Sequence, residues 1–132
     1  MIPERYAPIT YALFRIVFGF VFLLFGLQKV MGLFGRPAVE LMSMQGAAGV
    51  IETTCGLLIM IGLLAKLAAF IASGEMAVAY WLIHVSTIGG GLLPLQNMGV
   101  DATLFCFAFL YIATRGAGIW SVDSVIGSGR RR

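Results

Sequence analysis

Residues 46–88, GAAGVIETTCGLLIMIGLLAKLAAFIASGEMAVAYWLIHVSTI, decide the fold of this chain. They form two apolar runs that meet near Lys66, and each run is long enough to cross the hydrocarbon core of a bilayer as an α-helix. Each run also carries one acid, Glu52 in the first and Glu75 in the second. Because a carboxyl group is costly in hydrocarbon, we expect both acids to face the interior of a helix bundle. The rest of the chain must then supply the helices that enclose them.

The composition indicates that lipid is the solvent of this chain. Of its 132 residues, 60% are hydrophobic and only 11% are charged, and the mean hydropathy is +0.96. A soluble domain of this size could not hide so much apolar surface. The formal charge of +3 is matched by Arg130, Arg131 and Arg132, which read as a membrane-flanking tail. No basic stripe runs through the body of the chain, so we expect no nucleic-acid partner.

The apolar runs predict an all-α, integral membrane four-helix bundle that forms a single domain over residues 1–132. The four predicted transmembrane helices span approximately residues 9–34, 46–64, 67–88 and 100–114. Three consecutive glycines at 89–91 break the third helix, and residues 121–132 read as a tail.

The distribution of basic residues predicts the orientation. Four spans place both termini on one side of the membrane. The termini and the turn between the second and third helices hold Arg5, Lys66, Arg115 and Arg130 to Arg132. The other two loops hold Arg36, with Lys29 at the end of the first helix. Lys and Arg concentrate in cytoplasmic loops, so we expect both termini to be cytoplasmic.

One stripe of the first helix should face protein. Arg15, Gly19 and Gly26 share it at helical spacing, and the glycines allow a neighbouring helix to approach closely. Counted from the cytoplasmic side, Arg15 lies about 9 Å deep and Glu75 about 12 Å deep. We therefore predict a structural intramembrane ion pair between Arg15 and Glu75. A proton or ligand role for these two residues is the alternative.

A second group of polar residues belongs to the outer half of the bundle. Glu52, His84 and Asn97 are predicted to line one pocket there, with Gln28 and Lys29 nearby. A carboxylate and an imidazole beside an apolar cavity could bind a ligand or handle its protons. The alternative is that these side chains only satisfy one another and hold a loop in place.

Two further patterns bear on the site. In a regular α-helix, Glu75 and His84 lie nine residues apart and hence on nearly opposite faces, so they could share one site only if the helix were distorted. The two cysteines, Cys55 and Cys106, are expected to be free thiols. One histidine, separated acids and no ligand doublet predict no metal site.

Several segments, taken in order and spacing, resemble the DoxX family over nearly the whole chain. They are GLQKVMGLFG (26–35), GVIE (49–52), GLLIMIGLLAKLAA (56–69), GEMAVAYWLIH (74–84), PLQNMG (94–99) and CFAFLYIATRGAGIWSVD (106–123). The resemblance implies a small, multi-pass, four-helix protein of the bacterial cytoplasmic (inner) membrane. Relatives are linked to thiosulfate:quinone oxidoreduction and to membrane oxidoreductase complexes, and many members have no assigned activity.

The resemblance also covers individual polar positions. Those at which this chain matches the recurring polar residues of the family are Arg15, Gln28, Lys29, Glu52, Glu75, His84 and Asn97. The family commonly has an acid directly after the Asn-x-Gly turn, where this chain has Val100 followed by Asp101. One residue rotates a helical side chain by about 100 degrees, which leaves the role of Asp101 open.

Three functions compete. The first is a membrane subunit of an oxidoreductase system that holds a quinone or a small apolar ligand in the outer-half pocket. The second is a non-enzymatic partner or assembly factor for other membrane proteins. The third, a small-solute carrier, ranks last because the chain has no inverted repeat. The sequence leaves open whether the protein is an enzyme, and its glycine-rich faces could also serve a homo-oligomer.

Overall fold

The computed structural model describes residues 1–129, in which the regular elements are all helical and no strand occurs. The elements are η1, a 3₁₀ turn at Glu4–Tyr6, α1 (Ala7–Met31), α2 (Met44–Ile61), α3 (Ala65–Ala79), the π-helix η2 (Tyr80–Ile88), α4 (Val100–Arg115) and α5 (Val122–Gly129). The predicted basic tail at 130–132 lies outside the described residues.

Three helical segments are long and apolar enough to cross a membrane. They are Glu4–Met31, Met44–Ile61 and Ala65–Ile88, the last of which joins α3 to η2. The 16 residues of α4 extend about 24 Å, which is shorter than a hydrocarbon core of about 30 Å. The predicted all-α fold with apolar membrane-crossing helices is confirmed to this extent.

The ends of the first two helices differ from the predicted ones because of two glycines. Gly32 adopts the left-handed conformation with φ of 67°, and its N–H donates to the carbonyl of Gln28. Gly62 ends α2 in the same way, with φ of 72°. A left-handed glycine is a common helix terminator, so α1 and α2 each end three residues before the predicted positions 34 and 64.

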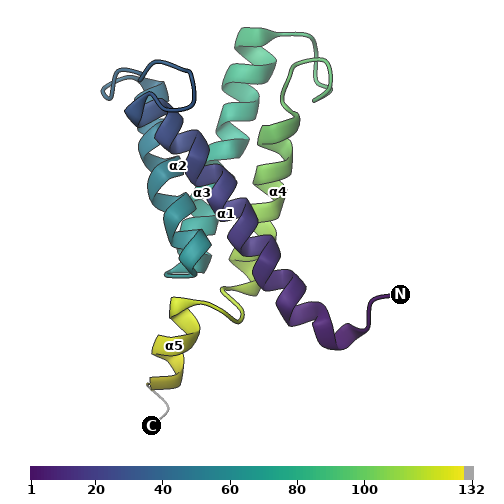
Figure 1. The fold of residues 1–132 in the computed structure, drawn as a ribbon. Helices are drawn as coiled ribbons and strands as arrows, with labels where there is room; N and C mark the ends of the chain where they lie inside the picture. The colour runs from purple at the N-terminus through teal and green to yellow at the C-terminus, as the bar shows by residue number, and fades with distance from the viewer. Residues whose placement is uncertain (130–132) are drawn as a thin grey trace.

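The segment that the sequence predicts to be a tail forms α5 in its described part, which corrects that prediction. The carboxylate of Asp123 accepts hydrogen bonds from the backbone N–H groups of Leu64 and Ala65, at 2.9 and 3.0 Å. The backbone N–H of Asp123 donates to the carbonyl of Gly62 at 2.9 Å. These bonds cap the otherwise unsatisfied start of α3 and attach α5 to the turn between α2 and α3 (Figure 1).

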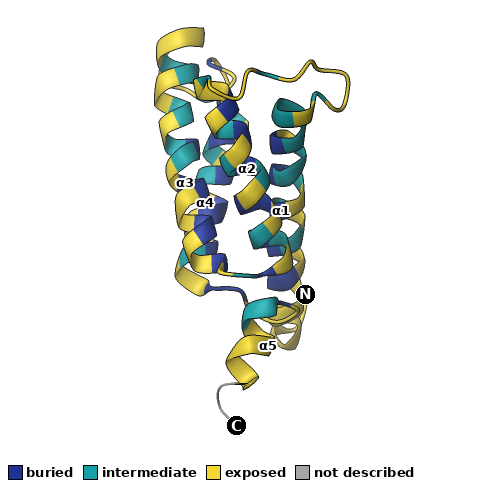
Figure 2. Cartoon of the chain, turned by 90° about the vertical axis from the view of Figure 1, so that its left-hand side faces the viewer, coloured by how far each residue is buried: buried dark blue, intermediate teal, exposed yellow. Residues whose placement is uncertain are grey.

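The helices pack mainly in two pairs, α1 against α2 and α3 against α4. The predicted close approach of α1 to a neighbour is confirmed. A Cβ atom added at Gly56 of α2 would lie 2.5 Å from the backbone nitrogen of Leu23, and one added at Gly19 of α1 would lie 2.5 Å from that of Met60. Buried residues lie between the helices, whereas the outward faces are mostly exposed (Figure 2).

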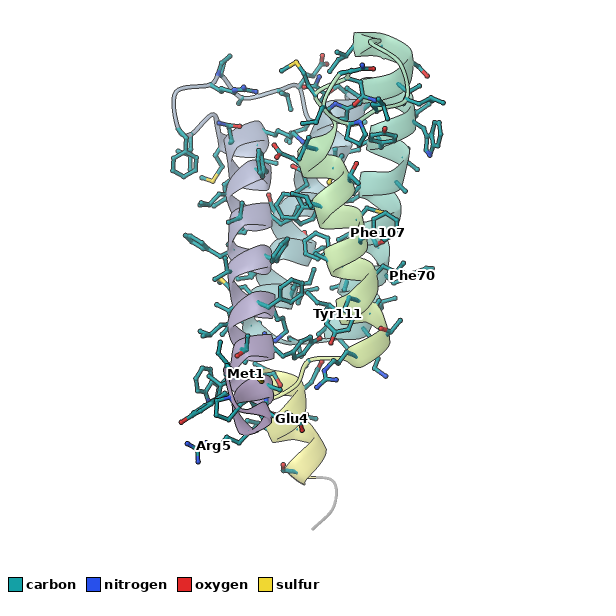
Figure 3. All side chains as sticks on the ribbon, turned by 90° about the vertical axis from the view of Figure 1, so that its right-hand side faces the viewer. Met1, Glu4, Arg5, Phe70, Phe107 and Tyr111 are labelled. Atoms are coloured by element: carbon teal, nitrogen blue, oxygen red, sulfur yellow. The ribbon has the colours of Figure 1, made fainter. Side chains whose placement is uncertain are left out.

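Aromatic rings connect the two pairs. The ring of Phe22 on α1 packs against Phe105 and Phe109 on α4, with centroid separations of 5.3 and 4.7 Å. In contrast, Phe70 on α3 and Phe107 on α4 point away from the other helices (Figure 3). Large exposed apolar side chains are costly in water, and a hydrocarbon environment removes that cost.

The N-terminus and α5 lie at the same end of the molecule, on opposite sides of it in the view of Figure 1. The loops 32–43 and 89–99 lie at the opposite end. The polar residues that form the candidate site gather toward this loop end.

Candidate functional site

A cavity of about 970 Å³ opens between the two helix pairs. Its walls are mostly apolar and come from α1, α2, α3, η2, α4 and the loop 32–43. The titratable side chains along the helical part of its wall are Lys29, Glu52, Glu75, His84 and Asp101. Its volume is at the upper end of the range of small-molecule sites, about 300–1,000 Å³.

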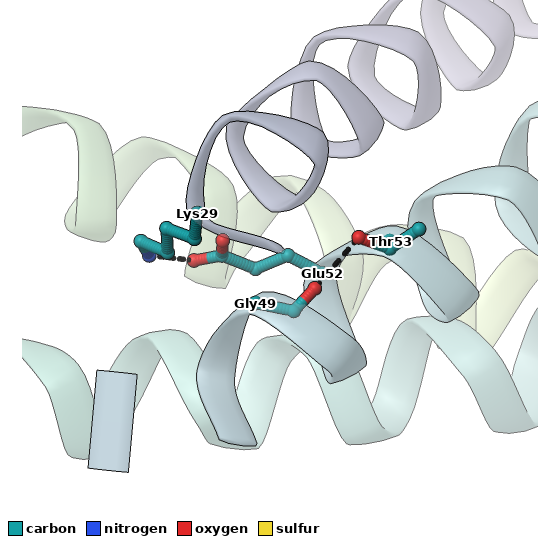
Figure 4. Close-up of polar contacts among 4 residues, drawn as sticks. All are labelled: Lys29, Gly49, Glu52 and Thr53. Atoms are coloured by element: carbon teal, nitrogen blue, oxygen red, sulfur yellow. Dashed lines mark hydrogen bonds and ion pairs between the residues drawn. The ribbon is translucent and has the colours of Figure 1, made fainter. Parts of the chain in front are cut away.

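Lys29 and Glu52 form an ion pair on the cavity wall. The Nζ atom of Lys29 donates to Oε1 of Glu52 at 2.5 Å, and Glu52 is only 2% exposed (Figure 4). The missing side chain of Gly49 lets α1 approach α2 closely at Lys29, because a Cβ atom added at Gly49 would lie 2.9 Å from the Cβ of Lys29. The neighbouring hydroxyl of Thr53 donates to the carbonyl of Gly49 instead of to Glu52. Within residues 1–129, Oε2 of Glu52 has no hydrogen-bond partner.

Glu75 and His84 both line the cavity, although they lie nine residues apart. The regular helix α3 ends at Ala79, and η2 continues it as a π-helix from Tyr80. The i→i+5 bonding of a π-helix widens the turn, so later residues face a different direction from the one that an α-helix would give them. The distortion that a shared site requires is therefore present, and π-segments often occur at functional sites.

Asn97 supports the cavity without lining it. Its side-chain amide donates to the hydroxyl of Tyr80 at 3.3 Å and to the carbonyl of Gly91 at 3.1 Å. Its Oδ1 accepts from the N–H of Gly99 at 2.9 Å. The Nδ1 atom of His84 lies 3.1 Å from the backbone carbonyl oxygen of Asn97. Asn97, which the sequence predicts to line the pocket, instead holds the loop 89–99 and contacts His84. Glu52, His84, Gln28 and Lys29 line the cavity.

The predicted ion pair between Arg15 and Glu75 is not formed among the described residues. Arg15 is fully buried and donates only to backbone carbonyls. Its partners are the carbonyl oxygens of Ile59 and Met60, both at 2.8 Å, and those of Ile119 at 3.2 Å and Trp120 at 2.6 Å.

The physical reason for this correction is the direction of the Arg15 side chain. Helical side chains lean toward the N-terminus of their helix, which carries the guanidinium toward the end of α2. The last carbonyls of a helix have no intrahelical donor, and a cation is favourable there. Glu75 lies ten residues after the start of α3 at Ala65, about 15 Å along the helix axis, and lines the cavity instead.

Glu75 lies with the outer-half polar residues and not, as the sequence predicts, with Arg15, and Asp101 joins the same cavity. Asp101 lines the cavity at an exposed position in the first turn of α4. One signal could have placed Glu75 correctly. A residue about 15 Å along a helix lies at the middle of a hydrocarbon core that is about 30 Å thick. From there the Glu75 side chain can reach the outer-half residues as easily as it can reach Arg15.

The remaining reactive groups add no cluster to the site. Cys55 and Cys106 are free thiols, and the hydroxyl of Ser73 bonds to the carbonyl of Cys106 at 2.8 Å. Over residues 1–129, no three His, Cys, Asp or Glu side chains are arranged to hold a metal ion.

Long apolar helices of this kind are typical of a helical membrane protein. The family model described as DoxX matches residues 10–85. A relative from Haemophilus influenzae (strain ATCC 51907 / DSM 11121 / KW20 / Rd), described as an uncharacterized protein, is 37% identical over 131 residues, covering 92% of this chain and 93% of that protein. No solved structure matches the chain significantly. The chain belongs to the DoxX family, and its apolar helices contact the lipid bilayer.

Proposed function

We propose that this protein is the membrane subunit of an oxidoreductase system in the bacterial cytoplasmic membrane, and that it binds a quinone or a similar small apolar ligand. The observation that supports this function best is the cavity of about 970 Å³, in which apolar walls surround Glu52, Glu75 and His84. A quinone ring needs an apolar slot, and its carbonyl oxygens need proton donors or hydrogen-bond donors beside that slot.

A path from the bilayer to the cavity supports a lipid-soluble ligand. Ile71, Val78 and Leu82 line the cavity and are also 44%, 56% and 48% exposed. The cavity therefore reaches the outer surface of α3 and η2, which faces lipid if these segments span the bilayer. A ligand dissolved in the membrane would enter sideways and would not need to cross an aqueous gate.

We also propose four spans with both termini in the cytoplasm, which places the cavity in the outer half of the membrane. Arg5 belongs to η1, Lys66 to the first turn of α3, and Arg115 is the last residue of α4. These element ends lie at the end of the molecule that also holds the N-terminus and α5 (Figure 1). Alkaline phosphatase fused after Gly129 should be inactive, whereas the same enzyme inserted in the loop 89–99 should be active. High activity of the fusion after Gly129 would reverse the orientation.

A cavity-filling variant tests ligand binding. Ala48 lines the cavity on α2, while Val50 on the same helix is 49% exposed and is not part of the cavity wall. Ala48→Phe should lower the amount of quinone that co-purifies from native membranes by about tenfold, a change of about 1.4 kcal/mol in binding. Val50→Phe should retain the wild-type amount, as measured by mass spectrometry of the organic extract.

The outcome also separates the competing functions. Equal retention by the two variants would contradict binding in this cavity. A wild-type protein that retains no quinone but carries a stoichiometric protein partner would favour the alternative of a non-enzymatic partner or assembly factor. Thermal unfolding in detergent controls for loss of fold in Ala48→Phe.

A further inference from the structure

The two glutamates of the cavity have different electrostatic partners. The Nζ atom of Lys29 forms an ion pair with Oε1 of Glu52 at 2.5 Å. Glu75 forms no ion pair with the residues that the structure describes, and its Oε2 atom is buried without a hydrogen-bond partner. The single lysine of the cavity wall therefore neutralises one glutamate and leaves the other uncompensated.

Besides Lys29, the described cation that lines the cavity is Arg36, which is exposed to solvent in the loop 32–43. The titratable and charged side chains that line the cavity with Glu75 are Lys29 on α1, Glu52 on α2, His84 on η2, Asp101 on α4 and Arg36 in the loop 32–43, and Cys55 is buried on α2. Glu52 and Asp101 are acids and disfavour a second negative charge nearby. An isolated carboxylate in apolar surroundings costs so much free energy that the group takes up a proton instead.

We propose that Glu75 holds a proton when the cavity is empty and donates a hydrogen bond from its carboxyl group to a carbonyl oxygen of the bound ligand, while Glu52 stays ionised beside Lys29. The part that concerns the ligand rests on the proposed function. A protonated carboxyl group supplies one O–H donor, which matches the acceptor that a quinone presents. Glu75 thereby becomes a ligand-binding residue, and Glu52 and Lys29 form a fixed pair beside it.

Infrared spectroscopy of the purified protein tests the protonation of Glu75 without any ligand. The wild type at neutral pH should show the C=O band of a protonated carboxyl group, and this band should shift in D₂O. The band should be absent in Glu75→Gln. It should remain in Glu40→Gln, which changes an exposed loop acid. Absence of the band from the wild type, or its persistence in Glu75→Gln, would overturn the proposal.

Binding of decylubiquinone between pH 6 and pH 9 tests the ligand contact. Ionisation of Glu75 removes its O–H donor, so the affinity of the wild type should fall as pH rises. Glu75→Gln keeps an N–H donor but cannot titrate, so its affinity should stay within about threefold of the wild type at pH 6 and should not change with pH. Glu75→Val should bind about tenfold more weakly at pH 6.

The two experiments fail in distinguishable ways. Wild-type affinity in Glu75→Val, or an unchanged pH dependence in Glu75→Gln, would overturn the role of Glu75 in binding. A wild type that binds no decylubiquinone at any pH would count against the proposed function and hence against the ligand contact, whereas the infrared band would still report the proton on Glu75.

Discussion

Lys29→Met should destabilise the protein at pH 8 by up to about 3–5 kcal/mol, because Glu52 then either stays a buried charge without its partner or must take up a proton. Glu52 is 2% exposed, and its ion pair with Lys29 is the only one among the described residues. The loss should be smaller at pH 5 than at pH 8, since Glu52 can then take up a proton more easily. Thermal unfolding in detergent at both values measures the effect.

A double variant distinguishes a stranded charge from lost packing. Lys29→Met combined with Glu52→Gln removes both charges and should recover most of the stability, because replacing a whole buried pair by neutral groups costs far less than breaking it. Lys66→Met changes an exposed lysine and should alter stability by less than about 0.5 kcal/mol. A double variant as unstable as Lys29→Met alone would contradict the account.

Arg15→Met should destabilise the protein at least as much as Lys29→Met, lowering the free energy of unfolding by about 4 kcal/mol or more. The variant removes the donor of four backbone carbonyls, two at the end of α2 and two in the segment before α5. Each buried acceptor left unsatisfied costs about 1–3 kcal/mol. Arg15→Lys keeps the charge but loses the planar guanidinium that reaches both α2 and the segment before α5. Its stability should therefore fall between that of the wild type and that of Arg15→Met.

Proteolysis gives a second measure of the same contact. In the wild type, Arg15 and Asp123 hold the segment between α4 and α5 in place, so trypsin should cleave after Arg115 slowly. Arg15→Met should speed this cleavage, while Arg5→Met, which changes an exposed arginine, should leave it unchanged. Equal unfolding temperatures for Arg15→Met and Arg5→Met would show that the buried guanidinium does not hold the two segments together.

The class of fold could be predicted because lipid permits few structures. Long apolar runs must satisfy their backbone groups internally, which leaves helices as the solution for segments of this length. The stripe with Arg15 and Gly19 followed directly from helical periodicity. The exact helix ends did not, because they depend on Gly32 and Gly62 adopting a left-handed conformation. The helix α5 depends on a tertiary contact of Asp123 that no local pattern indicates.

The site could be predicted only in part, for reasons that differ between residues. The sequence can place Glu52, His84 and Lys29 along one cavity because polar groups at similar depth in a bundle converge. Asn97 was misplaced because its amide bonds to its own loop. Glu75 was assigned to Arg15 because depth favoured that charge pair, whereas backbone carbonyls satisfied the guanidinium. The π-helix η2 has no residue signature, so its effect on the direction of His84 could not be read from the sequence.

Photoaffinity labelling with an azido-quinone in native membranes tests most directly whether the cavity is a ligand site. The account predicts labelled residues on two wall segments, 47–52 of α2 and 74–83 of α3 and η2. Excess unlabelled quinone should suppress this labelling, and so should Ala48→Phe, whereas Val50→Phe should not. Labelling spread over outward residues such as Phe70 and Phe107, unaffected by competitor and by Ala48→Phe, would contradict it.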